Sequence, residues 1–569
     1  MTISDLDDDT LITIVLFLSP DDVFNFSLTS KAIHLVLTTN AVYRILYFKK
    51  FGSKPTPLSL TEYNWKDLFH LRASSKAKLY TWGSSLLGRL GYLINDIPEN
   101  HTSIGFMSKN VHTPTNVPNF NGNIITDISA GGFSLQILVN NGSLYFTGAN
   151  WKKSETSKLT PGPFQSHDYT PSPLYALITT SIPHVVNLGS RRLIPTNSGS
   201  RMPGSWSRND RDISESTASN EPRRPTNPNL TLPPEEQSYP PSLESINQKS
   251  PKETSFVTKL EIPEVGKTDA KIVSISSGRE HIIALDNYHN LYSWDTGNTS
   301  KMAVRILFPG LDNKLISKIS AGWNLSVCQI DQIGLVVWYS RIPLTEENYI
   351  NKTMTSEARY VIIPETKHSQ IVDFMAGCDY VLIIKGDGRL YRFSINAHAF
   401  ATGDRDETMI EDLEKVDEFN KYLLERGSEI GKNTRFTKLE GCYNKFVVFT
   451  NDGLVLLGQK DLETPKILPE LQNRNITSVT IGDYHYLALT SNGEMLSWGT
   501  ESKQCGCLGL GPKQEIIDNN NGNVNDLGRQ NGMEVLRPMK VKRPAASGKW
   551  LAAAAAGWHS CGIFVPSLE

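Results

Sequence analysis

The sequence predicts a mainly β protein, a seven-bladed β-propeller preceded by a small N-terminal α-helical module. Two short motifs, each present in seven copies, predict the propeller. A different pattern, with apolar residues at helical spacing, fills residues 1–50 and predicts the helices. The 569-residue chain has a hydrophobic fraction of 39%, which gives a globular protein enough apolar mass for a large core.

The two motifs predict the same unit each time. The first is a small residue and a glycine, two variable residues and then an apolar strand, and its glycines are Gly131, Gly278, Gly322, Gly377, Gly441, Gly482 and Gly557. The second is Leu-Tyr-x-Trp-Gly or a weaker form, and its copies begin at Leu79, Leu144, Leu291, Leu335, Leu390, Leu454 and Met495. Asn-Gly or Asp-Gly pairs such as Asn141-Gly142 join the motifs in several copies, and they favour tight hairpin turns.

The order of the motifs predicts a closed ring. The chain meets the second motif first, at residues 79–83, and meets the first motif last, at residues 557–565. One repeat is therefore divided between two distant segments. In a ring these halves pair and leave no free sheet edge, whereas an open solenoid would need capping repeats. We therefore expect the propeller to span residues 76–568.

The repeats resemble the regulator-of-chromosome-condensation (RCC1) repeat family, whose blades carry Gly-x-x-His-Ser/Thr, Leu-Tyr-x-Trp-Gly and Gly-x-Leu-Gly. The last element matches residues 88–92 (GRLGY) and 507–511 (CLGLG). The resemblance covers the predicted propeller apart from its insertions and implies an RCC1-like fold. His281 and His485 fall at equivalent repeat positions, and we expect both to form structural hydrogen bonds within their blades.

The first 50 residues predict three or four short helices that make a small core. Apolar residues recur at helical spacing in residues 11–18, Pro20 interrupts the pattern, and Asp7 can cap the first helix. Residues 51–75 predict a linker helix near Trp65, which packs an aromatic side chain between the modules.

The string from Leu6 to Leu37 resembles an F-box. Leu6, Asp9 and Leu11 match the start of that motif, although Asp7 stands where the family usually has proline. The resemblance implies docking to the Skp-type adaptor of a cullin ubiquitin ligase through an apolar helix face. The candidate adaptor-binding residues are Leu6, Leu11, Ile14, Leu18, Pro20, Val23, Phe26 and Leu28.

Two insertions interrupt the predicted propeller. A Pro- and Ser-rich stretch lies in the long interval between Gly131 and Gly278, and it predicts a disordered insertion at about residues 153–268. An acidic stretch at about residues 402–432 carries Val416 and Leu423 at helical spacing, which predicts an inserted amphipathic helix. This helix either lies solvated on a blade or acts as an acidic docking element.

Catalytic and cofactor motifs are absent from the sequence. It contains no phosphate-binding Gly-x-x-x-x-Gly-Lys-Ser/Thr, no His-Glu-x-x-His and no paired Cys-x-x-Cys, and Cys505-Gly506-Cys507 alone is a weak metal motif. The net charge of −2 argues against a strongly basic nucleic-acid protein, and the apolar run at 11–18 is too short to cross a membrane. We therefore expect a non-catalytic binding protein without cofactor or metal, located in the cytoplasm, the nucleus or both.

The two variable residues after each motif glycine occupy equivalent loops, so a ring should gather them on one face around its axis. Aromatic and charged residues are frequent among them, as in interface hot spots. The aromatic side chains either bind a target there or pack inward between blades. The candidate target-binding residues are Phe133, Arg279, Glu280, Trp323, Asn324, Asp379, Tyr443, Asp483, Tyr484, Trp558 and His559.

The combination suggests a substrate-recognition subunit of an SCF-type ubiquitin ligase. Its helical module would bind the Skp-type adaptor and thereby the cullin core, and its propeller would bind a protein substrate, with no role for nucleic acid or membrane. A fungal F-box protein with the same repeats has adenine deaminase as its target, so the resemblance implies that enzyme as a candidate. The alternatives are a guanine-nucleotide exchange factor for a small GTPase, which leaves the helical module unexplained, and a non-catalytic scaffold.

Overall fold

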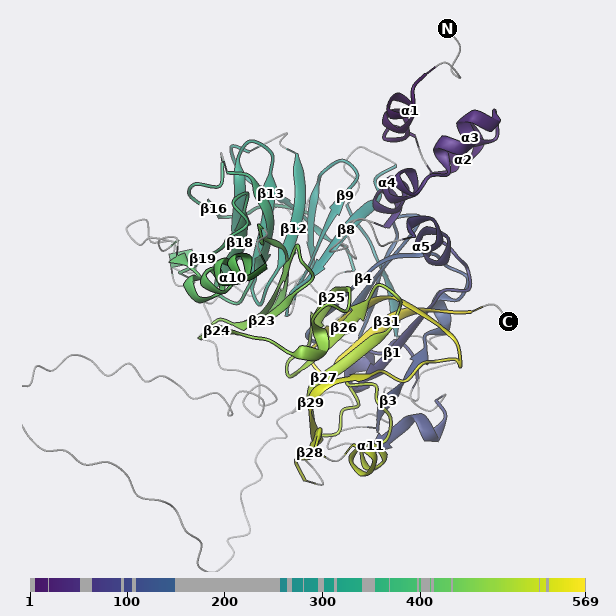
Figure 1. Ribbon diagram of the computed structural model, residues 1–569, viewed down its shortest axis with the longest axis vertical. Coiled ribbons are helices and arrows are strands. Elements are labelled where there is room, and N and C mark those ends of the chain that lie inside the picture. The colour runs from purple at the N-terminus through teal and green to yellow at the C-terminus, as the bar shows by residue number, and fades with distance from the viewer. Residues whose placement is uncertain are drawn as a thin grey trace, which may run out of the picture. The chain divides into compact units, whose positions relative to one another are not determined.

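Seven β-sheets follow one another along the described part of the chain as the blades of a propeller (Figure 1). This confirms the predicted mainly β, seven-bladed fold. The computed structural model describes residues 6–18, 20–51, 64–93, 97–104, 109–148, 256–263, 269–279, 281–294, 301–311, 315–339, 354–367, 369–396, 399–400, 410, 414–430, 433–520, 522–528 and 532–567.

Each of the first six blades begins with its inner strand and adds later strands outward, except at the outer edge of blade 6, where the last two strands lie in reverse chain order. Blade 1 is β4 (Ile125–Gly131), β5 (Ser134–Val139), β6 (Leu144–Thr147) and β7 (Val257–Leu260). Blade 2 is β8 (Ile272–Ser277), β9 (Ile282–Asp286), β10 (Leu291–Trp294), β11 (Val304–Leu307) and β15 (Thr355–Glu357). Blade 3 is β12 (Ile316–Ala321), β13 (Leu325–Ile330), β14 (Gly334–Tyr339) and β16 (Tyr360–Ile362). Blade 4 is β17 (Ile371–Ala376), β18 (Tyr380–Lys385), β19 (Leu390–Ser394) and β20 (Glu414–Lys415). Blade 5 is β21 (Phe436–Cys442), β22 (Lys445–Thr450), β23 (Val455–Gln459) and β24 (Leu462–Lys466). Blade 6 is β25 (Ile476–Ile481), β26 (His485–Thr490), β27 (Met495–Ser502), β29 (Gly532–Lys540) and β28 (Val524–Asp526).

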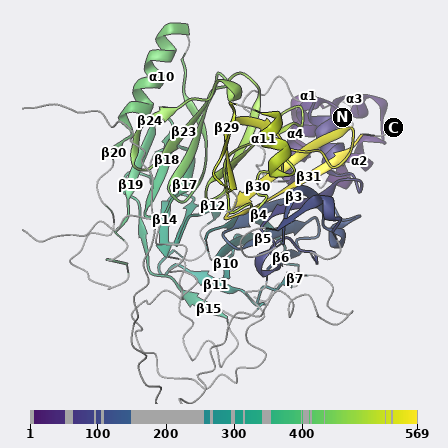
Figure 2. The same cartoon turned by 90° about the horizontal axis from the view of Figure 1, so that it is seen from below.

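Blade 7 joins two distant segments of the chain. Its strand order is β30 (Gly548–Ala556), β31 (His559–Pro566), β1 (Lys78–Gly83), β3 (Lys109–Asn116) and β2 (Thr102–Ile104). The antiparallel register pairs Tyr80 with Gly562, and the inner strand β30 contacts both β25 and β4 (Figure 2). The ring closure predicted from the divided repeat is therefore present.

Tight hairpins connect the second and third strands of several blades. Their turn glycines have φ values of +80° at Gly142, +74° at Gly388, +89° at Gly453 and +86° at Gly493. These values lie in the left-handed region, where a side chain is strained and glycine is not. The Asn-Gly and Asp-Gly pairs thus determine where each strand turns.

Histidines connect neighbouring blades. His281 Nε2 lies 2.8 Å from Ser326 Oγ in blade 3, and His485 Nε2 lies 2.8 Å from Ser560 Oγ in blade 7. The prediction of hydrogen bonds within a blade was therefore wrong, because the imidazole reaches across to the next sheet. Burial lowers the pKa of both rings, to about 4 for His281 and about 3 for His485, so both are neutral at physiological pH.

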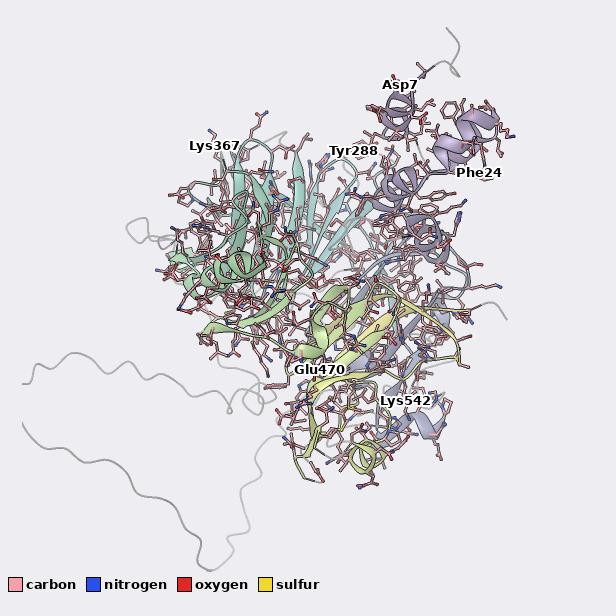
Figure 3. The ribbon with its side chains drawn as sticks, in the orientation of Figure 1. Asp7, Phe24, Tyr288, Lys367, Glu470 and Lys542 are labelled. Carbon is pink, nitrogen blue, oxygen red and sulfur yellow. The ribbon has the colours of Figure 1, made fainter. Side chains whose placement is uncertain are left out.

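Four helices form the N-terminal module, and a fifth follows it. They are α1 (Asp8–Val15), α2 (Pro20–Ser27), α3 (Lys31–Leu37), α4 (Asn40–Phe51) and α5 (Trp65–Arg72). Asp7 caps α1 as predicted, since its carboxylate accepts a hydrogen bond from Thr10 N at 2.7 Å and this bond lowers the pKa of Asp7 (Figure 3). Trp65 is buried with Tyr47 and Phe48 of α4, at ring distances of 5.4 Å.

The predicted insertions are only partly described. Residues 149–255 lie outside the described residues, and so does the disorder predicted for them. Strand β7 lies inside the predicted span 153–268 and pairs with β6, so that span extends too far. In the acidic insertion, helix α10 (Asp417–Ile430) begins after Val416 and packs Phe419 and Leu423 into the core shared by blades 4 and 5.

The other helices among the described residues are short. They are α11 (Lys513–Asn519) and the 3₁₀ helices Leu86–Gly88, Glu99–His101, Pro118–Phe120 and Pro469–Leu471. In the described part of the chain, no helix has the length and apolarity needed to span a membrane.

Candidate functional site

The first candidate site is an apolar patch on helices α1–α3. Buried residues from the four helices of the module and from α5, including Val15, Ile33 and Val42, form one shared core. Other large apolar side chains of α1–α3 and their ends are 52–83% exposed. We call these the apolar patch, and they are Leu16, Phe17, Phe24, Leu28 and Leu35.

The local sequence places this patch outward. Phe24 lies on α2 (Figure 3), and Leu28 follows directly after the end of that helix, four residues along, so both side chains lie on the same side of it. Lys49 of α4 supports the end of α1, because its Nζ donates to the carbonyl oxygens of Leu16 at 2.6 Å and Leu18 at 2.7 Å. These hydrogen bonds give a donor to main-chain carbonyl oxygens that have no partner within the helix, because they lie at its C-terminus. They also hold the segment that carries Phe17 in place.

The predicted adaptor-binding residues divide between core and surface. Leu11 and Val23 are buried, Leu28 is exposed, and Pro20 begins α2. Those that are half-buried are Leu6, Ile14, Leu18 and Phe26. Sequence reasoning missed the other patch residues because it followed helical periodicity, which marks the side that packs inward.

The second candidate site is the face on which the glycine-bearing loops converge. Main-chain hydrogen bonds link these loops from blade to blade: Gly132 N to Arg279 O, Arg279 N to Trp323 O, Trp323 N to Gly377 O, Cys378 N to Tyr443 O and Asp483 N to Gly557 O, all between 3.0 and 3.2 Å. A Cβ atom on Gly557 would lie 2.2 Å from Gly132 O, so the loops leave no room for one there. We call this surface the axial face.

Arg279 lies at the centre of the axial face. Its Nη1 donates to Asp483 Oδ1 of blade 6 at 2.6 Å. Its guanidinium carbon lies 5.1 Å from the ring centroid of Phe133 in blade 1, 4.7 Å from that of Trp323 in blade 3 and 5.5 Å from that of Tyr443 in blade 5. One side chain of blade 2 therefore contacts four other blades.

The electrostatics of this centre favour the charged guanidinium. Burial acts to lower the pKa of Arg279, but Asp483, Tyr443 and Cys442 together act against burial and the pKa is raised. Burial raises the pKa of Cys442 to about 12, so its thiol stays protonated at neutral pH. The face thus offers cations and aromatic rings, without an activated thiol at Cys442.

The structure places the predicted target-binding residues in three groups. Arg279, Tyr443 and His559 are buried; Phe133, Trp323, Asn324, Asp379, Asp483 and Trp558 are half-buried; Tyr484 is exposed. Glu280 lies outside the described residues. Tyr443 packs inward while Tyr484 is exposed, and target binding by the exposed rings stays a prediction. Sequence reasoning missed Arg89, whose guanidinium carbon lies 5.4 Å from the Phe133 ring centroid, and Lys445 and Lys503, which pair with Tyr484 and Trp558.

A cavity of about 440 Å³ is lined by the inner strands of the blades. Two ion pairs contribute to its lining, Lys438 with Glu440 at 2.8 Å and Lys318 with Asp373. Over the described residues, no group of three or more His, Cys, Asp or Glu side chains is arranged to hold a metal ion. Cys505 and Cys507 are buried, and burial and the neighbouring Cys505 raise the pKa of Cys507 well above its ordinary value.

Comparison with known families accounts for both modules. The F-box domain model matches residues 3–44, and the RCC1 repeat models match residues 76–135 and 476–507. The chain carries an F-box and RCC1 repeats. The F-box match covers α1–α3 and with them the whole apolar patch, while the repeat matches fall in blades 7, 1 and 6.

Two curated proteins are similar to this chain in sequence. The chain is 29% identical to SCF-associated factor 1 of Saccharomyces cerevisiae over 93% of this chain and 92% of that protein. It is 24% identical to F-box protein pof9 of Schizosaccharomyces pombe over 53% of this chain and 60% of that protein. Among solved structures, Prp20p of Saccharomyces cerevisiae aligns over 87% of this chain and 92% of its own, with a TM-score of 0.48 and 12% identity.

Proposed function

We propose that this chain is the substrate-recognition subunit of an SCF-type ubiquitin ligase. The apolar patch on α1–α3 would bind the Skp-type adaptor and thereby the cullin core, and the axial face would bind the target. The observation that carries the proposal is the apolar patch, because it lies within the F-box match and exposes five large apolar side chains. Such clusters mark protein–protein interfaces.

The role requires no reactive group from this chain. A receptor accelerates ubiquitin transfer by holding the target close to the charged carrier, which raises the effective concentration of the reacting groups. The axial face suits this role, since it presents aromatic and charged side chains from several blades without an activated thiol at Cys442. The free thiols of all six cysteines also support a location in the reducing cytoplasm or nucleus.

Adenine deaminase is the first target to test, because the resemblance to a fungal F-box protein with these repeats implies it. A reconstituted ligase containing this chain should ubiquitinate purified adenine deaminase, and omission of the chain should abolish the modification. Modification of other candidate proteins but not of adenine deaminase would retain the receptor role and exclude this target.

Adaptor capture tests the proposed role directly. In the full chain, we expect Phe24→Asp/Leu28→Asp to weaken binding of a purified Skp-type adaptor by about 10- to 100-fold, because a carboxylate would replace each apolar contact. Leu11 is unsuitable for this test, since its burial means that a charge there would unfold the module. Binding is measured by calorimetry with equal amounts of folded protein.

Leu424→Asp provides the matched control, since Leu424 is an exposed leucine on α10. It should leave adaptor binding unchanged. If the unaltered chain does not bind the adaptor, the receptor role is wrong. Nucleotide release from a small GTPase in the presence of the chain would then identify an exchange factor instead.

A further inference from the structure

The cavity of about 440 Å³ is lined by the inner strands of all seven blades and by Arg72 of α5. Its volume falls within the range of about 300–1,000 Å³ that small-molecule pockets occupy. Two of its lining residues remain partly exposed, since the side chain of Lys318 is 40% exposed and Val372 is 43% exposed. Both lie near the start of an inner strand, so a small molecule can enter the cavity from that end.

The charged side chains of this cavity are bound by the protein itself. Asp373 accepts from Lys318 Nζ and, through its other oxygen, from a main-chain N–H of blade 5. Glu440 accepts from Lys438 Nζ at 2.8 Å and, through its other oxygen, from a main-chain N–H of blade 6. The described lining holds as many cations as carboxylates, namely Arg72, Lys318 and Lys438 with Asp127, Asp373 and Glu440. The cavity therefore favours an occupant without net charge.

Polar groups of the lining keep hydrogen-bonding capacity for an occupant. Thr480 Oγ1 and Arg72 Nε are buried, and neither has a hydrogen-bond partner among the described residues. Ser276 Oγ and Ser320 Oγ each accept a main-chain N–H of the next blade at 3.0 Å, which leaves the hydrogen of each hydroxyl to donate. Because a buried polar group without a partner costs free energy, an occupant that hydrogen-bonds to these groups is stabilised.

Methyl groups also line the cavity. They include those of Ala130, Ala321 and Ala553, in blades 1, 3 and 7. An occupant can therefore combine apolar C–H contact with hydrogen bonds to hydroxyls. A molecule that carries several hydroxyl groups on a carbon frame matches this lining, since each of its hydroxyls both donates and accepts.

We propose that the cavity binds a small neutral polyol of the sugar or cyclitol class, with its hydroxyls hydrogen-bonded to Ser276, Ser320 and Thr480. The balanced charges exclude a preference for an ion, and the hydroxyls of the lining supply the specificity. This site lies on the inner strands, apart from the apolar patch, and it goes beyond the proposed ligase role without depending on it.

Isothermal calorimetry on the full chain tests the site. The probes are myo-inositol and glucose, with glutamine as a zwitterion of comparable polarity. Each is kept at or below about 10 mM, because polyols at high concentration stabilise proteins by exclusion from the surface rather than by binding. We expect at least one of the two polyols to bind saturably at a single site, and glutamine not to bind.

Thr480→Val removes the hydroxyl and keeps the shape of the side chain. Since Thr480 Oγ1 has no partner in the described part of the protein, the midpoint of thermal unfolding should not fall. Polyol binding should weaken by about two- to ten-fold, as for the loss of one hydrogen bond. Ala553→Leu fills part of the cavity and should abolish binding, and if that variant is unfolded, Thr480→Val carries the test.

Thr258→Val is the matched control, because it makes the same change on β7, outside the residues that line the cavity. It should leave polyol binding unchanged. Absence of saturable binding by both polyols would mean that the cavity holds solvent alone, and it would overturn the proposal. Binding of glutamine without a polyol would overturn the assigned ligand class.

The location of the ligand has its own test. Polyol binding that is unchanged in both Thr480→Val and Ala553→Leu would place the ligand elsewhere and overturn this site. Because the assay contains no adaptor and no target, its failure would refute the polyol site alone. Failure of adaptor capture would refute the ligase role and leave the polyol site standing.

Discussion

Individual buried side chains carry charge states that depend on the fold. Glu501 on β27 is buried, and burial raises the pKa of its carboxyl to about 7, although main-chain N–H groups of Gly506 and Leu508 oppose the rise. An unfolded chain would ionise the same carboxyl near its ordinary pKa of 4.5. Protonation of this one residue is therefore linked to stability.

Glu501 makes the folded state less stable as pH rises from about 4.5 to about 7. In this range the folded state binds a proton that the unfolded state has released, so the free energy of unfolding falls with pH and levels off above 7. We expect Glu501→Gln, which is always neutral, to raise the free energy of unfolding at pH 8 by about 1–3 kcal/mol and to flatten this part of the profile. Chemical denaturation of the variant and the parent at pH 5 and pH 8 measures both free energies of unfolding.

Glu494→Gln is the comparison for Glu501→Gln. The hydrogen bond from Lys540 lowers the pKa of Glu494, so this carboxylate stabilises the folded state at neutral pH. Glu494→Gln should therefore not raise the free energy of unfolding at pH 8. A Glu501→Gln variant that is equally stable or less stable than the parent at pH 8 would contradict the assigned cause.

At the scale of elements, helix α5 is joined to the propeller by Arg72. The Arg72 guanidinium donates to Thr126 O of β4 at 3.0 Å and to Leu551 O of β30 at 3.2 Å. It also lies over the Phe51 ring of α4 at 5.4 Å. One buried side chain therefore contacts the end of the helical module and the inner strands of two blades.

Replacing Arg72 should loosen this junction. Arg72→Met keeps a long apolar stem but leaves two buried carbonyl oxygens without their donor, and we expect a loss of about 2–4 kcal/mol in the free energy of unfolding. Limited proteolysis between residues 51 and 65 should accelerate. Arg474→Met, at a partly exposed arginine, should change neither measurement. Unaltered proteolysis of Arg72→Met would show that other contacts hold α5.

Elements differ in how well the sequence predicts them. The turn glycines and the paired motifs specify local conformation, so the strand order and the closure through β1 and β31 could be predicted. The Arg279–Asp483 pair could not, because these residues are 204 positions apart and meet only when blades 2 and 6 share an axis. Most of the apolar patch was missed for a different reason: Phe17 and Phe24, for example, are exposed, whereas the helical pattern marks the residues that pack inward.

At the scale of the whole molecule, the two candidate sites should be separable. Phe24→Asp/Leu28→Asp should weaken adaptor capture and leave target binding at the axial face unchanged, whereas Arg279→Gln should weaken target binding and leave adaptor capture unchanged. Both should abolish ubiquitination of a bound target in a reconstituted ligase, since each breaks one of the two connections that proximity requires. Normal ubiquitination by either variant would show that the altered site is not needed for that target.

The position of β31 between β1 and β30 also governs how this protein is made. A ribosome adds about 5–20 residues per second, so roughly half a minute to a minute and a half separates synthesis of Gly83 from that of Pro566. Throughout that interval β1 can pair with β3 but lacks its other partner, β31, and this edge of the nascent sheet stays open. Translation pauses and chaperone supply will therefore set the yield of folded protein as much as equilibrium stability does.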